Sequence, residues 1–513
     1  MNDMSIYKRI KSRLDEKGKL PHDFSLEPKQ APNKISFMPG AMDGIGVFHM
    51  GKSDEKTEVN KIGELIRKHY KTGKPKYIKA IKKRLSVTRS LSIVDPLLES
   101  IRADHEGMNP NQAVKLTLEL LKTSDSIELV KLGIAMMGLF DLSGVSEAVD
   151  LFTVLGAYED FTLFCVVAAG NWTNSNAIVF NLAKRVDGWG KIHAVERLNP
   201  ETEEIRDWIL REGCSNSVMD AYLGLECAQK GDLISMLRKD VLDDGIFESV
   251  SVIVDALLDE GPTAGISEYE HAEESLKLYL GHAVKQANKV SQLCRILNLR
   301  LWAESAKVEY KNEIMASCDE ITNRPNWQDI ILSVVRQRKD NYEFSYACNA
   351  ANRLRIDIHA ELLAAVKEQP LQNCYYIPQL MKDVDTTKEL TMICETILPL
   401  SEMAVGMGDW LFPDKLHREY QCLDFVLPAL ADYPMIGEKL IKTGLNSRVT
   451  RNRNMACRAL QGWEIAMGKP LHEISNELFD EVKRICMLEV NDQTRETMKS
   501  LLDKSIATKV VDG

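Results

Sequence analysis

Two pairs of acidic residues and histidines have the spacing that a carboxylate-bound di-iron site requires. Such a site takes a Glu-x-x-His pair from each of two helices and further carboxylates from two others. Glu268 and His271 have this spacing. Asp414 and His417 have it too, with aspartate in the place of glutamate. Both pairs open an expected helix, where charged first turns need no ligand to explain them, so we expect solvated helix ends and no metal.

Asp43 and His49 are a second candidate pair, because they lie in an irregular segment rich in proline and glycine. Binding and catalytic residues concentrate in such segments. Alternatively, Asp43 shapes a tight turn with Gly44, which an Asp-Gly pair favours, and His49 packs the segment down. We expect residues 20–53 to form an ordered arm along the first helices, because residues 35–50 are too apolar for a disordered linker.

A run of basic residues is the third candidate. Between Lys61 and Arg89 there are eleven Lys and Arg and one acid, Glu64. Tyr70 and Tyr77 lie within the run, and aromatic rings can stack on nucleic-acid bases. The run could hold phosphates, or it could be a solvated helix pair that offsets the acidic remainder of the chain. Its candidate binding side chains are Lys79, Lys82, Lys83 and Arg84.

Other reaction centres have no counterpart in the sequence. A haem thiolate needs a cysteine in a dedicated glycine-rich loop, and dinucleotide binding needs G-x-G-x-x-G after a strand. The nearest match to the second motif, Gly44-Ile-Gly46, follows no expected strand and lacks the third glycine. The sequence also shows no Ser-His-Asp set, phosphate loop or zinc box. We therefore expect no cofactor.

Composition places the chain among cytoplasmic globular proteins. Of the 513 residues, 44% are hydrophobic and 27% are charged, with a net charge of −10. Residues 1–90 hold 21 Lys and Arg against 10 Asp and Glu, so the remainder is strongly acidic and makes a poor general nucleic-acid surface. The N-terminus has no apolar signal, and the most apolar run, 161–172, is too short to cross a membrane. Eleven scattered cysteines without a CxxC pair indicate reduced core residues.

The stretch 187–213 is the unit around which the other elements are organised. Its apolar residues recur on one side of each of two short helices: Trp189, Ile192, Val195 and Leu198, then Ile205, Trp208 and Ile209. Asn199 is expected to cap the second helix and Pro200 to begin it. Neither helix can bury its apolar side alone, so the unit needs neighbours of the same kind.

From residue 54 onward nearly every segment predicts a helix, and no segment shows the alternation of a strand. The expected helices include 109–123, capped by Asn109, and one long helix over 290–315. We divide the chain into an N-terminal helix and arm (1–53), a first helical-repeat segment (54–319) and a second one (320–513).

Two stretches share a pattern of a basic residue, alanine three positions later and leucine four positions after that. They are Lys191, Ala194 and Leu198, and Arg453, Ala456 and Leu460. In a helical hairpin repeat the alanine allows close approach of the preceding repeat, and the basic residue reaches polar groups between successive turns. On these two units the chain resembles HEAT-like repeat proteins. The resemblance implies an elongated right-handed superhelix with a concave binding face.

A second resemblance covers residues 39–51, 188–213 and 447–463. These stretches look like parts of bacterial chains labelled limonene hydroxylase. The label implies a monoterpene hydroxylase, but no residue of the shared stretches has an assignable catalytic role. HEAT-like DNA glycosylases are a second possible class of enzyme. They hold duplex DNA in a basic concave groove, and the basic run could form such a groove.

The sequence therefore predicts an all-α fold, an α-solenoid of HEAT-like helical hairpins with an irregular N-terminal arm. The predicted function is a binding scaffold for a protein partner, without a membrane or a cofactor. Two alternatives stay open: an enzyme of either kind named above, and a nucleic-acid binder that uses residues 61–89.

Overall fold

The computed structural model describes residues 4–26, 37–49, 56–103, 108–261, 263–410 and 417–511. Across these ranges the chain is helical, and its one β-type contact is an isolated bridge between Trp410 and Val449. The predicted all-α fold is confirmed. None of the described helices combines the length and the apolarity needed to cross a membrane. The chain forms two compact units that divide between Ile330 and Ile331, while the predicted boundaries at 53 and 319 stay a prediction.

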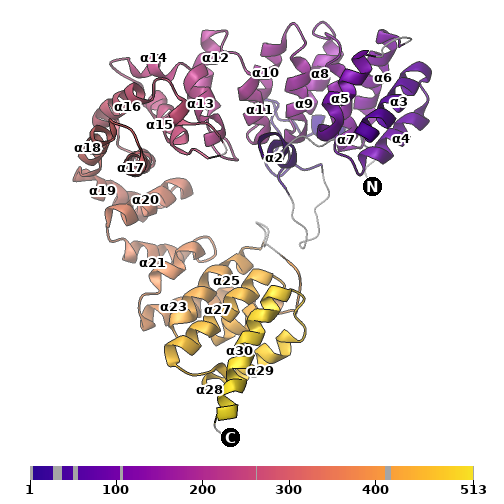
Figure 1. Ribbon diagram of the computed structural model, residues 1–513. Helices are drawn as coiled ribbons and strands as arrows, with labels where there is room; N and C mark the ends of the chain where they lie inside the picture. The colour runs from indigo at the N-terminus through magenta and orange to yellow at the C-terminus, as the bar shows by residue number, and fades with distance from the viewer. Residues whose placement is uncertain are drawn as a thin grey trace. The chain divides into compact units, whose positions relative to one another are not determined.

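Unit 1 comprises the described residues up to 330 (Figure 1). Its helices are α1 Ile6–Lys11, α2 Ala41–His49, α3 Lys56–Thr72, α4 Pro75–Leu85, α5 Ser90–Ala103, α6 Pro110–Thr123, α7 Ile127–Met137, α8 Ser146–Leu155, α9 Glu159–Ala169, α10 Ser175–Ala183, α11 Trp189–Arg197, α12 Glu203–Trp208, η1 Ile209–Gly213, α13 Ala221–Lys230, α14 Leu233–Leu237, α15 Asp244–Leu258, η2 Ile266–Glu268, α16 Ala272–Gln286, α17 Val290–Ser305 and α18 Lys311–Thr322. The next helix, α19 (Asn326–Gln337), contains the division between the units.

The helices of unit 1 pack in the order of the chain. Each of α3, α5, α7, α9, α11, α13 and α15 contacts the next odd-numbered helix, up to α17. We call this series the odd-numbered layer. A second series of helices packs beside this layer. In it α6 contacts α8, α8 contacts α10, and further along the chain α14 contacts α16 and α16 contacts α18. Successive helices thus bury their apolar sides against their neighbours in sequence.

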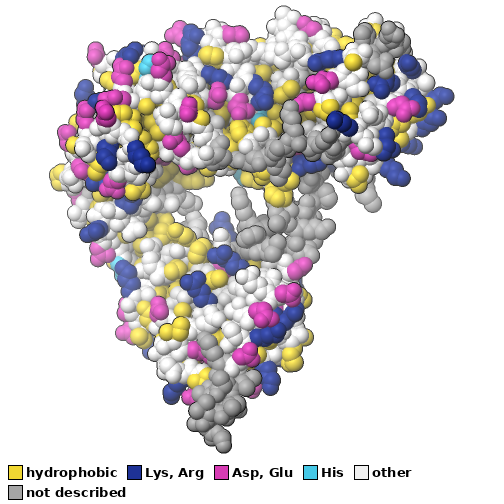
Figure 2. All heavy atoms as spheres, viewed as in Figure 1, with side chains coloured by type: hydrophobic (Ala, Val, Ile, Leu, Met, Phe, Trp, Pro, Cys, Tyr) yellow, Lys and Arg dark blue, Asp and Glu magenta, His cyan; other side chains and the backbone are white. Residues whose placement is uncertain are grey.

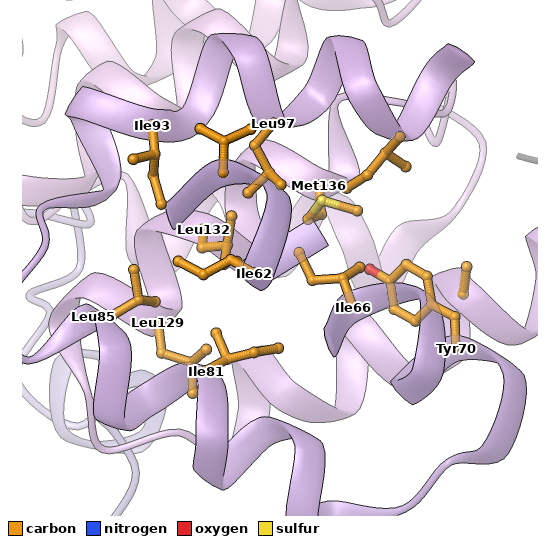
Figure 3. Close-up of a cluster of buried hydrophobic side chains, with 13 residues drawn as sticks. Ile62, Ile66, Tyr70, Ile81, Leu85, Ile93, Leu97, Leu129, Leu132 and Met136 are labelled. Atoms are coloured by element: carbon orange, nitrogen blue, oxygen red, sulfur yellow. The ribbon is translucent and has the colours of Figure 1, made fainter. Parts of the chain in front are cut away.

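The first helices of unit 1 enclose a hydrophobic core (Figure 3). Helix α3 contributes an apolar stripe with helical spacing that ends at Tyr70: Val59, Ile62, Ile66 and Tyr70. The Tyr70 hydroxyl shares a hydrogen bond of 2.7 Å with the Thr117 hydroxyl of α6. Burial raises the pKa of Tyr70 to about 12, so this hydroxyl stays neutral and the core carries no charge there.

The unit predicted over 187–213 is a helix, a corner and a second helix, and its seven predicted apolar residues are buried. The predicted cap was wrong. Thr202, not Asn199, caps α12, because its hydroxyl accepts the Ile205 N–H at 3.3 Å. The Asn199 backbone instead exchanges two hydrogen bonds with the Asn176 side chain, which joins this corner to α10.

Two further expectations need correction, and one is confirmed. Asp43 and Gly44 do not form a tight turn, because both lie inside helix α2. The helix expected over 290–315 is two helices, since Ala306 adopts extended backbone after α17 and α18 folds back against α17. Asn109 caps α6 as predicted, accepting the Gln112 N–H at 3.2 Å.

Unit 2 comprises the described residues from 331 onward. After the end of α19 its helices are α20 Asn341–Leu354, α21 His359–Glu368, η3 Cys374–Tyr376, α22 Ile377–Leu380, α23 Val384–Ile397, α24 Leu400–Met403, α25 Arg418–Ala429, η4 Leu430–Asp432, α26 Glu438–Leu445, α27 Thr450–Met467, α28 Leu471–Ile474, α29 Asn476–Cys486 and α30 Asp492–Val511. All eleven cysteines of the two units are free and buried, as the sequence predicted for core residues.

A buried ion pair joins α27 to the turn between α29 and α30. Arg453 donates from Nε to Glu489 Oε2 at 2.6 Å and from Nη2 to Oε1 at 2.7 Å, and both side chains are 0% exposed. Arg453 also donates to the Ser447 carbonyl at 2.8 Å. Arg453 therefore reaches polar groups of the turns before α27 and before α30. Lys191, its counterpart in unit 1, likewise reaches the Ser215 carbonyl at 2.5 Å.

Asp424 of α25, which accepts from Asn452 of α27 at 2.7 Å, gives unit 2 a pH dependence. Burial raises its pKa to about 6, although Arg451 and Asn452 act in the opposite direction. The folded state therefore holds a proton that the unfolded chain releases near pH 3.8. The free energy of unfolding should fall as pH rises between these two values and stay flat above them.

Asp424→Asn should remove this cost. We expect it to stabilise unit 2 at pH 7 by about 1–3 kcal/mol and to flatten the stability profile between pH 4 and 6. Hydrogen exchange of the α25 and α27 amides measures both effects. Asp432→Asn, the same change at an exposed position, should leave the profile as it is. A profile that Asp424→Asn does not flatten would contradict this assignment.

Candidate functional site

Helix α2 lies against the odd-numbered layer, and we call the surface beneath it the α2 site. Three residues of α2, namely Ala41, Asp43 and Gly44, are buried, whereas Val47 on the same helix is 43% exposed. Gly40, Gly44 and Phe48 recur at intervals of four, so they share one side of the helix with Asp43. This side makes the contacts with the layer, and the chain thus binds a helix of its own on the layer's surface.

A buried charge network fixes the middle of α2. Asp43 accepts from Lys131 of α7 at 2.6 Å and from Arg89, which precedes α5, at 2.8 Å. Lys131 and Asp43 are only 2% and 3% exposed. Two more carboxylates flank Lys131, Glu128 at 3.3 Å and Asp160 at 3.7 Å. Burial alone would lower the pKa of Lys131, but these three carboxylates outweigh it and raise that pKa above its ordinary value.

The N-termini of three helices border α2. Leu91, Asp160 and Trp189, which border α2, stand in the first turns of α5, α9 and α11. A helix N-terminus carries the positive end of the helix dipole and stabilises a nearby carboxylate. The Gly40 N–H, just before α2, donates to Asp160 at 2.9 Å and so fixes the start of the arm to α9.

Carboxylates in this region also cap neighbouring helices of the odd-numbered layer. Glu159 of α9 accepts the N–H groups of Asp187, Gly188 and Gly190 at the start of α11, at 2.5–2.9 Å. Burial raises the pKa of Glu159, and these three donors limit the rise. Glu128 of α7 caps α5 in the same way, through the Ser90 N–H at 2.5 Å. These caps join α7 to α5 and α9 to α11, so the part of the odd-numbered layer beneath α2, which we call the platform, is held together by its own hydrogen bonds.

An aromatic cluster holds the end of α2. The Phe48 ring lies 5.0 Å from the Tyr222 ring and 6.0 Å from each of the Trp189 and His193 rings, centre to centre. His193 is 1% exposed, its ring lies 6.0 Å from Phe48 and 6.3 Å from Trp189, and its Nδ1 lies 3.5 Å from Glu196. It is a packed histidine. Phe48 thus anchors α2 to α11 and α13.

Gly44 allows α2 to approach the layer closely. A Cβ at this position would overlap the Trp189 indole, whereas a Cβ at Gly46 would lie 3.1 Å from the flexible end of Leu91. Gly44→Ala should therefore lift α2 from its site and cost about 1–3 kcal/mol of docking free energy, even though alanine favours a helix.

Hydrogen exchange of the α2 amides tests this expectation, with Gly46→Ala as the matched control. Both substitutions add the same methyl group to the same helix. We expect faster exchange in Gly44→Ala and unchanged or slower exchange in Gly46→Ala. Equal behaviour of the two variants would mean that α2 does not depend on contact with Trp189.

The residues predicted as one basic binding set all lie on α4, and two of the four are paired with acidic residues. Lys82 pairs with Asp125 at 2.5 Å, and Arg84 pairs with Glu58 at 2.9 Å. Lys79 and Lys83 are exposed, and neither forms an ion pair with another described residue. Figure 2 shows Lys and Arg side chains gathered at the end of unit 1 where α3 and α4 lie.

The other predicted candidates have different outcomes. Asp43 belongs to the α2 site, and His49 ends α2 with a side chain that lies outside the described structure. Asp414 also lies outside it, while Glu268 is an exposed residue of η2. In the described part of the chain no three His, Cys, Asp or Glu side chains form a group that could hold a metal ion.

Sequence reasoning missed Lys131, the residue at the centre of the α2 site. One signal for it was available, because Lys131 is the single charged residue in the apolar run 129–137. A lysine that the helix must bury requires a partner. Its partner Asp43 stands 88 positions away, a distance that no local pattern can bridge. In comparisons with known proteins, no protein-family model and no curated protein matches this chain.

Proposed function

We propose that this chain is a HEAT-like α-solenoid of the cytoplasm that binds a protein partner on its odd-numbered layer. One observation carries the proposal: this layer already binds a helix, α2, through a buried ion pair and an aromatic anchor. The serial contacts of the odd-numbered helices, and of the helices behind them, support the solenoid. Such arrays present extended surfaces on which partner segments dock.

Site-specific photo-crosslinking in the native cell tests the proposal. A photoreactive side chain would replace Val167 of α9 or Leu301 of α17, which are 52% and 60% exposed apolar residues of the odd-numbered layer. Lys115, exposed on α6, is the control position. We expect one discrete protein adduct from the odd-numbered layer and none from Lys115. No adduct from either layer position, or equal adducts from all three, would refute the proposal.

Nucleic-acid binding by α3 and α4 is the second candidate function. It is favoured by the spacing of Lys76, Lys79 and Lys83, which lie on one side of α4 and are all exposed. On this hypothesis, Lys79→Glu with Lys83→Glu should weaken duplex binding at least about tenfold and reduce the salt slope by about 2.

Lys82→Glu is the matched control, because its ammonium group is already paired with Asp125. It changes the charge of α4 by the same amount per residue and should reduce binding less. A wild-type chain that does not bind duplex DNA at low salt would remove this candidate. The enzyme readings, monoterpene hydroxylase and DNA glycosylase, stay predictions without an assigned catalytic residue.

A further inference from the structure

We infer that α2 is a built-in competitor for the partner, and that the partner docks with a short helix that carries an acidic residue and an aromatic residue five positions later. This inference rests on the proposed function and names the partner's chemistry and its regulation. It follows from what α2 presents to the layer: one carboxylate at Asp43, one ring at Phe48 and glycine where the surfaces meet.

The charge of the α2 site selects an acidic residue. Lys131 and Arg89 both donate to Asp43, at 2.6 Å and 2.8 Å. A basic side chain at this position could not accept from Lys131 and Arg89, and a neutral side chain would bring them no negative charge. A docking helix that keeps both of these hydrogen bonds has aspartate or glutamate where α2 has Asp43.

The site also tolerates the departure of α2. Without Asp43, Lys131 keeps Glu128 at 3.3 Å and Asp160 at 3.7 Å, so the buried ammonium group is not left without a counter-charge. Arg89 is 41% exposed and can be hydrated. The carboxylates that cap α5 and α11, Glu128 and Glu159, bond to the layer itself and not to α2. The platform can thus persist while its occupant exchanges.

A partner can gain more contacts than α2 makes. A cavity of about 260 Å³ adjoins the start of α2, where Met38 and Pro39 line it opposite Trp189 of α11, with Lys19, Glu159 and Arg185 also in its lining. Phe24 and Tyr158 form part of its apolar wall. A partner helix preceded by a large apolar residue would fill this space, which the chain's own Met38 and Pro39 leave open. The extra burial gives a partner the means to displace α2.

A labelled peptide of residues 37–49 is the probe, and the full-length chain is the receptor. We expect the chain with Asp43→Ala and Phe48→Ala, whose own helix is weakened, to bind the peptide at least about tenfold more tightly than the wild type. A peptide with the same two alanines should not bind, and Lys131→Met added to the receptor should abolish binding of the unaltered peptide.

A second measurement uses only the wild-type chain and so does not depend on how the variant folds. Saturating peptide should speed hydrogen exchange of the receptor's own residues 41–48, because the peptide takes their place. Equal affinity of both receptors, binding that ignores the two anchors, or unchanged exchange at saturation would overturn the inference. The photo-crosslinks from Val167 and Leu301 would remain in that case, so the failure would not extend to the proposed function.

Discussion

Arg453→Met should destabilise unit 2 by about 3–5 kcal/mol, because it leaves the buried Glu489 carboxylate without its cation. Glu489 is 0% exposed in its side chain, and two of its three described donors come from Arg453. The third is the Asn491 N–H at 2.9 Å. Hydrogen exchange of the α27 and α29 amides measures the loss for unit 2 separately.

Two further variants separate the charge from the packing. Arg453→Met combined with Glu489→Leu should be more stable than Arg453→Met alone, since an apolar pair of similar volume needs no counter-charge. Lys499→Met, on α30, breaks an exposed pair with Glu496 and should cost less than about 1 kcal/mol. If Arg453→Met costs no more than Lys499→Met, the buried pair does not stabilise unit 2 as proposed.

Lys131→Met should destabilise unit 1 by about 3–5 kcal/mol and release α2 at the same time. The change leaves three carboxylates facing one another, and Asp43 among them is 3% exposed. Hydrogen exchange should therefore rise in α7 and α9 as well as in α2. Lys122→Met, which removes a half-exposed pair with Glu147, is the control and should cost less than about 1 kcal/mol.

The same substitution should change the pH dependence of unit 1. The pKa of Lys131 is raised in the folded chain, so its contribution is complete below the ordinary value of 10.5 and is lost as pH rises above it. The variant should lack this alkaline loss. Its deficit should also shrink as pH falls from 7 toward 5, because the three carboxylates that lose their shared cation can then take up protons. A deficit that is independent of pH would show that lost packing, not lost charge, causes the effect.

Helix positions could be predicted from the sequence wherever the determinants are local. Asn109 and Pro110 start α6 as expected, and the apolar spacing of residues 189–198 places one side of α11 in the core. Helix α2 could not be predicted in this way. Its glycines lower helix propensity, and its stability comes from contacts with Lys131 and Trp189, which lie far along the chain.

One partner of the ion pair in the α2 site could be predicted from the sequence, and the other could not. Asp43 could be selected because it lies in an irregular segment, but its chemistry could not, since the cation it binds is on α7. The free charge of the basic run could not be predicted for a related reason. Arg84 and Lys82 are neutralised by Glu58 and Asp125, which stand outside residues 61–89, so the charge count within the run overstated the free positive charge.

The buried cysteines allow the local unfolding of each unit to be measured in the unmodified chain. Five thiols lie in unit 1 and six in unit 2, and each is shielded from reagents while its helices stay packed. Alkylation under native conditions therefore requires an opening event at the modified residue, and its rate reports how often that opening occurs. Mass spectrometry of the modification at Cys165 and Cys457 would give the opening rates of the two units in one sample, without any change to the sequence.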